Sequence, residues 1–136
     1  MQTTATFKVS TFEPIDLEPP DTRTGTPVGV ARMVKDFQGG LAGRAETLFT
    51  SAFDQQRGIG TYVAMESFAG SLDGRSGSFN FAHTASTDGG PDRLHEVVVI
   101  VPGSGTDELS GLSGSGRIRI DDDGTHFLEL EYAFGG

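Results

Sequence analysis

Apolar and polar residues alternate along most of the chain with a period of two. Near the start, Ala5, Phe7 and Val9 alternate with polar neighbours, and the alternation returns repeatedly downstream. This period places apolar side chains on one face of an extended strand, whereas helical spacing is sustained nowhere. The chain is therefore predicted to be all-β. The predicted strands cover residues 5–9, 28–37, 41–53, 62–68, 78–84, 96–101, 117–120 and 126–134.

Turn residues separate these segments at short intervals. Asp73-Gly74 and Asp123-Gly124 are pairs typical of tight hairpins, because their backbone needs positive φ. Pro14, Pro19 and Pro20 stand among acidic residues and predict the longest exposed connection. About eight antiparallel strands favour a single closed barrel, since closure removes exposed sheet edges, and an open sandwich is the alternative. We expect residues 1–136 to form one β-barrel domain.

A glycine-flanked leucine recurs three times, in residues 39–43, 70–74 and 110–114. A phosphate cradle would require a following lysine and a helix, and neither is present. We therefore expect each leucine to plug a barrel end while the glycines turn the corner.

Composition narrows the functional classes. The 136 residues contain no cysteine, which excludes disulfides, thiol catalysis and cysteine zinc sites. A net charge of −9 argues against a nucleic-acid partner, which needs a basic face. There is neither an apolar run of membrane-spanning length nor a secretory signal, so we expect a cytoplasmic protein without membrane contact.

The segment from Tyr62 to Thr84 carries the most suggestive chemistry. With a turn at Asp73-Gly74, Phe81 would lie opposite Glu66 and His83 opposite Ala64. Tyr62, Glu66 and His83 would then line one interior. A buried carboxyl beside an imidazole can act as a general acid and base, so Glu66 and His83 are the candidate catalytic residues. The alternative is that the two merely satisfy each other or the backbone.

Other polar groups receive structural interpretations. His95 and His126 stand beside charged or turn residues and are expected at the surface, and no spacing among the histidines predicts a metal site. Residues 121–124 are expected to form a solvated hairpin tip, not a calcium loop. Arginines in 117–119 should face the glutamates of 129–131 across two outer strands. The serine at 104 lacks the strand–turn–helix context of a nucleophile elbow, so a hydrolase is not expected.

Two strings resemble those of a bacterial family of uncharacterised small proteins: L-D-G-R-S-G-S-F at 72–79 and V-P-G-S-G-T at 101–106. The resemblance extends more loosely over most of the chain. At 67 and 82 this chain has serine and alanine where the family pattern has arginine and a longer polar residue, both on the face expected to point outward. The family is similar in fold to allene oxide cyclase, within a superfamily of calycin-like barrels that includes dirigent proteins.

The resemblance implies a barrel that binds an apolar, reactive small molecule, needs no cofactor and forms a homodimer, although fold alone does not transfer chemistry. One hypothesis is a cyclase or isomerase of a polyketide-like or lipid-like substrate, with Glu66 and His83 moving protons. A second is a non-catalytic carrier, and a third is a structural protein whose barrel is filled by phenylalanine. The expected ligand-binding residues are Tyr62, Phe68, Phe79, Phe81 and Tyr132.

Overall fold

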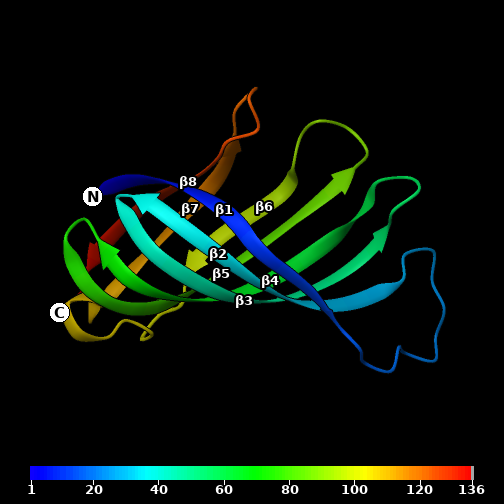
Figure 1. The fold of residues 1–136 in the computed structure, drawn as a ribbon, viewed down its shortest axis with the longest axis horizontal. Coiled ribbons are helices and arrows are strands. Elements are labelled where there is room, and N and C mark those ends of the chain that lie inside the picture. The colour runs from blue at the N-terminus through cyan, green and yellow to red at the C-terminus, as the bar shows by residue number, and fades with distance from the viewer. Residues whose placement is uncertain (136) are drawn as a thin grey trace.

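A computed structural model describes residues 1–135 of the chain, which fold into eight antiparallel strands that close into a ring (Figure 1). Each strand pairs with the next along the chain, and β1 pairs with β8 to complete the barrel. One short 3₁₀ helix, η1, precedes β7. The strands are β1 (Gln2–Ile15), β2 (Val28–Gly39), β3 (Leu41–Asp54), β4 (Ile59–Leu72), β5 (Arg75–Asp88), β6 (Leu94–Ile100), β7 (Leu112–Ile120) and β8 (His126–Phe134), and η1 is Asp107–Leu109. The all-β expectation is confirmed.

The barrel has two different ends. The capped end carries the tight turns after β2 and β4 and the segment 101–111, and both termini lie there (Figure 1). The loop end carries the connections 16–27, 55–58, 89–93 and 121–125. At the capped end, Thr106 bonds back to Ser78 through both backbone and side chain, which holds segment 101–111 against the start of β5. The two ends therefore differ in how completely they are closed.

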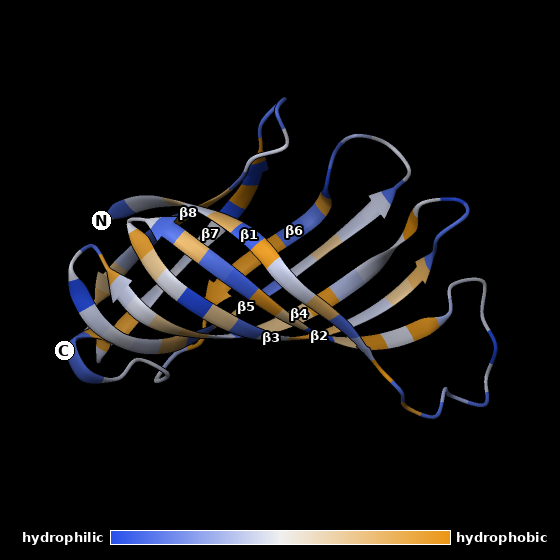
Figure 2. Ribbon diagram, in the orientation of Figure 1, coloured by the Kyte–Doolittle hydropathy of each residue, from blue (hydrophilic) through white to orange (hydrophobic). Residues whose placement is uncertain are grey.

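The capped half of the interior is packed solid. Apolar and polar residues alternate along the strands (Figure 2), so one face of each strand turns inward. The three repeated leucines, Leu41, Leu72 and Leu112, are at most 2% exposed and plug this end together with Leu109, as the repeats predicted. Burying four such side chains contributes roughly 1.5–3 kcal/mol each.

Two glycines make room for the Phe68 ring in this core. Gly43 and Gly70 lie opposite each other on β3 and β4, with φ of +150° and +153°. A Cβ atom at either position would come within 3.0 Å of Phe68 Cζ and closer still to a backbone oxygen. The absence of side chains there lets Phe68 lie across both strands.

The strands extend further than the hydrophobic pattern predicted. Pro14 was expected in an exposed connection but lies in β1, opposite Ala31 of β2. It is tolerated because β1 pairs with β8 only from Gln2 to Phe7, so the other edge of β1 is free near Pro14. Pro19 and Pro20 lie in the connection 16–27, as expected.

The ring is weakest between β6 and β7, where only two residue pairs join the strands: Val98 with Gly116 and Val99 with Ser115. Beyond these pairs, the Glu96 carboxylate accepts a 2.8 Å hydrogen bond from the Ile118 amide. A side chain thus replaces a missing ladder bond and closes the barrel toward the loop end.

The outer wall exposes a neutral row across four strands. Leu48, Met65, Ala82 and Val99 are successive register partners on β3, β4, β5 and β6. Leu48 is 56% exposed and Met65 45% exposed. Since η1 is three residues long, the part of the chain that the structure describes has no helix able to cross a membrane.

Candidate functional site

Above the packed core, toward the loop end, the interior opens into a cavity of about 180 Å³. This volume is several times the roughly 30 Å³ that one water molecule occupies in the liquid. Apolar and ionisable side chains from seven strands and one loop meet there. The lining residues are Phe7, Val9, Met33, Lys35, Phe49, Tyr62, Ala64, His83, Arg93, Ile118 and His126. We call this space the inner cavity.

A buried ion pair lies at one wall of the inner cavity. The Lys35 ammonium is 3.0 Å from Glu66 Oε1 and donates a 3.1 Å hydrogen bond to Oε2. The Thr47 hydroxyl donates a further 3.1 Å hydrogen bond to Oε1. Lys35 is 5% exposed and Glu66 1% exposed, so both charges are almost fully desolvated. Such a pair persists only when each partner is satisfied by the other.

Strand register explains how these residues meet. β3 lies between β2 and β4, and it places Ala45 opposite Lys35 and Thr47 opposite Glu66. The methyl side chain of Ala45 leaves the lysine stem room to pass over β3. Lys35 lines the inner cavity whereas Glu66 does not, and the Lys35 ammonium lies 5.3 Å from the ring centroid of Phe7, another lining residue.

A second set of polar contacts begins on the same strand as Glu66, nearer the loop end, with Tyr62 of β4 and His83 of the adjacent β5. The Tyr62 hydroxyl is 3.1 Å from His83 Nε2 and accepts a short hydrogen bond from the guanidinium of Arg93 in loop 89–93. Glu96 Oε2 lies 3.5 Å from His83 Nε2 and 3.9 Å from Arg93 Nε. Since Arg93 already donates to Tyr62, the Tyr62 hydroxyl is free to donate its own proton to a neutral imidazole.

His83 is neutral at physiological pH. Burial, reinforced by the positive charges of Lys35 and Arg93, lowers its pKa from 6.5 to about 3. The carboxylate of Glu96 opposes this shift, but its charge is shared with Arg93, so desolvation prevails. Burial also raises the pKa of the Tyr62 hydroxyl against the opposing charge of Arg93.

The charges around the inner cavity therefore cancel. Two cationic side chains, Lys35 and Arg93, face two carboxylates, Glu66 and Glu96, while His83 carries no charge. A charged ligand would disturb this balance in a poorly solvated space, and a neutral ligand would not.

A second hollow of about 490 Å³ lies nearer the loop end and adjoins the first. Phe49, Tyr62 and Arg93 line both, so they form the boundary between them. Phe49 stacks on Tyr62 at 5.2 Å between ring centroids, and Phe12 meets the Phe49 edge at 6.0 Å. This mouth is rich in aromatic surface and leads from solvent toward the inner cavity.

The predicted residues of the 62–84 hairpin occupy the expected register. Phe81 lies opposite Glu66 and His83 opposite Ala64, and both Glu66 and His83 are buried. The structure nevertheless gives the two residues different partners. Glu66 pairs with Lys35 and Thr47, while His83 contacts Tyr62 and Glu96. Facing the same interior was thus not enough to make them partners.

The aromatic residues expected to bind ligand divide in two. Tyr62 lines both hollows. Phe68, Phe79 and Phe81 pack on one another in the solid capped half, with ring centroids 5.3 and 5.9 Å apart. Tyr132 lies at the capped end, where burial and its hydrogen bond to Asp73 raise its pKa to about 12. These four residues belong to the packed core of the barrel and do not line the inner cavity.

Four ionisable residues in or beside the inner cavity were not predicted as site residues: Lys35, Arg93 and His126, which line it, and Glu96, which contacts His83. Lys35 had a detectable signal, since it shares the period-two face of Met33 and Phe37. His126 was expected at the surface but lines the inner cavity beside Phe7, at 5.4 Å between ring centroids. It alternates with the buried Leu128, so its strand phase pointed inward. His95 is exposed, as expected.

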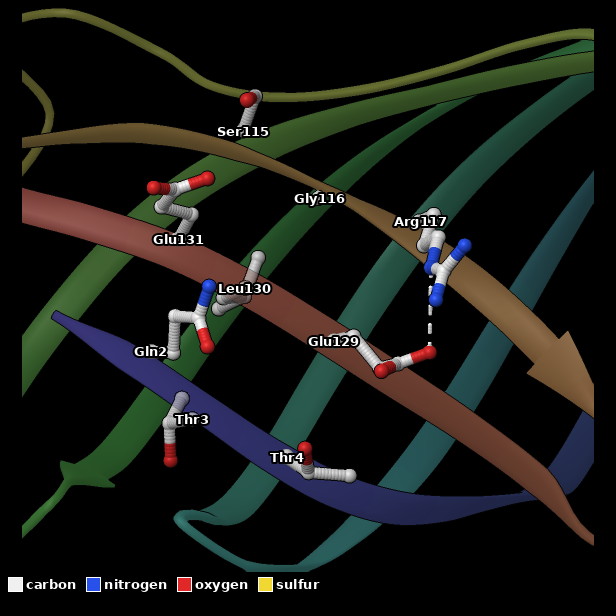
Figure 3. A pocket seen from close by; sticks show the side chains of 9 residues that line it. All are labelled: Gln2, Thr3, Thr4, Ser115, Gly116, Arg117, Glu129, Leu130 and Glu131. Atoms are coloured by element: carbon white, nitrogen blue, oxygen red, sulfur yellow. Dashed lines mark hydrogen bonds and ion pairs between the residues drawn. The ribbon is translucent and has the colours of Figure 1, made fainter.

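The outer wall of the barrel carries a separate groove lined mainly by polar and charged side chains. This groove of about 440 Å³ crosses β7, β8 and β1 on the outer wall, and Arg117 spans it to Glu129 at 3.2 Å (Figure 3). This contact confirms the predicted cross-strand charge pair for Arg117 and Glu129, whereas Glu131 lies opposite Ser115. The groove's charged side chains lie on the outer wall in contact with solvent, so it is not the candidate site. Within residues 1–135, no three metal-ligating side chains come close enough to hold a metal ion.

Comparison with known proteins places the chain in a family. A family model described as a protein of unknown function, DUF3224, matches residues 3–132. A solved structure of a DUF3224 protein of unknown function from Shewanella oneidensis MR-1 is similar over 100% of this chain and 98% of its own, with 33% identity and a TM-score of 0.87. No curated protein matches the chain. With the same closed ring of strands and a match over nearly its whole length, the chain belongs to the DUF3224 family.

Proposed function

We propose that the barrel binds a neutral, largely apolar small molecule that carries one carbonyl or hydroxyl oxygen. The observation that carries this proposal is the inner cavity itself, an apolar space with a few convergent polar groups, continuous in its lining with an aromatic mouth. Ligand sites are commonly built this way, at the open ends of small barrels. The similarity to allene oxide cyclase expected from the sequence implies the same class of ligand.

The polar groups of the inner cavity indicate which functional group of the ligand would lie there. Lys35 lines the inner cavity, and the Tyr62 hydroxyl would have to turn its proton from His83 to a ligand oxygen, whereas the nearby carboxylates are occupied by cations. An oxygen acceptor would satisfy these donors without changing the balance of charge. Phe12, Phe49 and Phe53 would cover an apolar tail in the mouth. Each buried CH₂ of such a tail contributes about 0.8 kcal/mol.

A thermal-shift screen on three proteins tests this function. The panel contains apolar ketones, aldehydes, epoxides and alcohols, and the proteins are the parent, Ala64→Leu and Ala82→Leu. Ala64 is buried and lines the inner cavity, while Ala82 lies on the outer face of β5, so the same substitution fills the site only in the first variant. A ligand at about a hundred times its dissociation constant should stabilise the parent and Ala82→Leu by about 2.7 kcal/mol, and Ala64→Leu much less.

The proposal fails if no member of the panel stabilises the parent, or if Ala64→Leu responds as strongly as Ala82→Leu. In the first case the inner cavity is only a gap in the packing, as expected for a structural protein whose barrel is filled by side chains. In the second case the ligand binds elsewhere on the barrel.

Catalysis by a cofactor-free cyclase or isomerase is a second candidate function. It is favoured by Lys35 and Tyr62, which would stabilise negative charge developing on a carbonyl oxygen once the Tyr62 hydroxyl turns its proton from His83 to that oxygen. The proton-transfer role first expected for Glu66 and His83 fits less well. Glu66 is held by Lys35, and an imidazole with a pKa of about 3 is a weak base.

Turnover assays with the ligands found in the screen separate an enzyme from a carrier. An enzyme of this kind should lose most of its rate in Tyr62→Phe, by about 10²-fold or more, while still binding the substrate. A carrier would bind the same molecules and return them unchanged. Unaltered turnover in Tyr62→Phe would remove the hydroxyl from the mechanism.

A further inference from the structure

We propose that Lys35 forms a Schiff base with an aldehyde or reactive ketone bound in the inner cavity, with Glu66 as its counter-ion. This inference rests on the proposed function and narrows the ligand to a carbonyl compound. It makes the barrel a covalent and reversible carrier through one specific amine.

The position of the amine supports this role. Lys35 is one of the most deeply buried polar residues, yet it lines the inner cavity beside Phe7, Met33 and Phe49. Its carboxylate partner, Glu66, is not part of that lining, and the Lys35 ammonium lies 5.3 Å from the ring centroid of Phe7, which is. An ion pair that served only to stabilise the barrel would be better made by arginine, whose planar fork binds a carboxylate at two points. Lysine instead provides a nitrogen that can become a nucleophile.

The carboxylate is placed to manage the protons of the reaction. Glu66 accepts one proton from the Lys35 ammonium, and the freed electron pair on Nζ attacks the carbonyl carbon as the C=O pair moves to oxygen. A proton passes from nitrogen to that oxygen, and protonated Glu66 then returns its proton so that the hydroxyl leaves as water. An ammonium and a carbonyl compound thus give an iminium and one water, with no change in total charge and no oxidant.

The product suits the site as well as the reactant does. The iminium keeps the positive charge on Nζ, so the salt bridge to Glu66 persists, and Thr47 continues to donate to the carboxylate. Apolar walls limit the access of water that would hydrolyse the imine. The charge balance of the inner cavity is the same before and after the reaction.

The chain contains its own control for this chemistry. It has only two lysines, Lys35 and Lys8, and Lys8 is exposed on the outer face of β1. The experiment incubates the native protein with cinnamaldehyde and, separately, with an aliphatic aldehyde, and then adds sodium borohydride. Intact mass measures the extent of trapping, and peptide mapping measures labelling at Lys35, Lys8 and the terminal amine. Lys8→Arg repeats the measurement with Lys35 as the only lysine.

Faster labelling of Lys35 than of Lys8, by about tenfold or more, supports the proposal, because a held carbonyl has a high effective concentration. Labelling that follows exposure, with Lys8 or the terminal amine ahead, overturns it. Glu66→Gln should slow trapping at Lys35 and change its dependence on pH, whereas Asp36→Asn on the outer face of β2 should do neither.

The outcome is separable from that of the proposed function. If an aldehyde and its matching alcohol both raise the melting temperature but borohydride leaves Lys35 unlabelled, the barrel binds without forming an imine. If neither molecule changes the melting temperature and Lys35 is unlabelled, both proposals fail. Labelling of Lys35 that Ala64→Leu abolishes would support both.

Discussion

Removing one partner of the Lys35–Glu66 pair should destabilise the barrel more than removing both. In Lys35→Met, the Glu66 carboxylate keeps only the Thr47 hydroxyl as a direct partner in a site where it is 1% exposed. Breaking a buried pair in this way costs about 3–5 kcal/mol. For a chain of this length, that loss corresponds to a fall in melting temperature of about 10–15 °C.

The double variant Lys35→Met/Glu66→Met removes both charges and keeps similar volume. Apolar replacements of buried ion pairs are often neutral or stabilising, so its free energy of unfolding should lie within about 1–2 kcal/mol of the parent. If Glu66→Met alone also costs about 3–5 kcal/mol, the coupling energy between the two positions should therefore be at least about 4 kcal/mol. Lys8→Met, on the outer face of β1, is the matched control and should change stability by less than about 0.5 kcal/mol.

Urea unfolding followed by far-UV circular dichroism measures the parent, Lys35→Met, Glu66→Met, the double variant and Lys8→Met, since the chain has no tryptophan to report by fluorescence. The reasoning is refuted if Lys35→Met is as stable as Lys8→Met. It is also refuted if the double variant loses the sum of the two single losses, because the charges would then act independently.

Three further predictions concern other parts of the barrel. The folded-state pKa of His83 is about 3 and the unfolded value is near 6.5, so the unfolded chain binds the proton first as the pH falls. His83 therefore lowers the free energy of unfolding by about 1.4 kcal/mol per pH unit well below pH 6.5. Urea titrations near pH 7 and 5 should show a smaller pH dependence in His83→Gln, and an equal dependence would contradict this origin. Gly70→Ala should cost about 1–3 kcal/mol, since its Cβ would stand 2.2 Å from the Ala42 oxygen at φ +153°, whereas Gly29→Ala, with open space around it, should be close to neutral in the same melts. Tyr132→Phe should lose about 1.5–3 kcal/mol of stability by removing the hydrogen bond to the Asp73 carboxylate, and a variant as stable as the parent would mean that water replaces the hydroxyl.

Local patterns were enough to predict the class of fold and one hairpin in detail. Period-two alternation identified extended strands because successive side chains must point to opposite faces. The Asp73-Gly74 turn then determined that Phe81 faces Glu66, since a two-residue loop leaves little freedom in register. The repeated leucines were correctly expected at a barrel end, where glycines permit the chain to turn.

The site itself depended on contacts between strands that are not neighbours in the chain. Alternation and the hairpin register showed that Glu66 and His83 point inward from adjacent strands, but could not show which groups of other elements would pair with them. Lys35 reaches Glu66 across β3 only because Ala45 is small there, and Arg93 reaches Tyr62 only because loop 89–93 folds over the mouth.

The division between core and cavity was likewise a tertiary result. The two-residue alternation indicates only that an aromatic residue faces inward. It does not show that Phe68, Phe79 and Phe81 fill the capped half while Phe49 and Tyr62 line the open half. The difference arises because segment 101–111 closes one end of the barrel and nothing equivalent fills the other in residues 1–135. The sequence by itself determined which way most side chains of the predicted strands point, through the two-residue period of the strand. Closure of the ring alone decided which inward groups meet, because that depends on the positions of all eight strands at once.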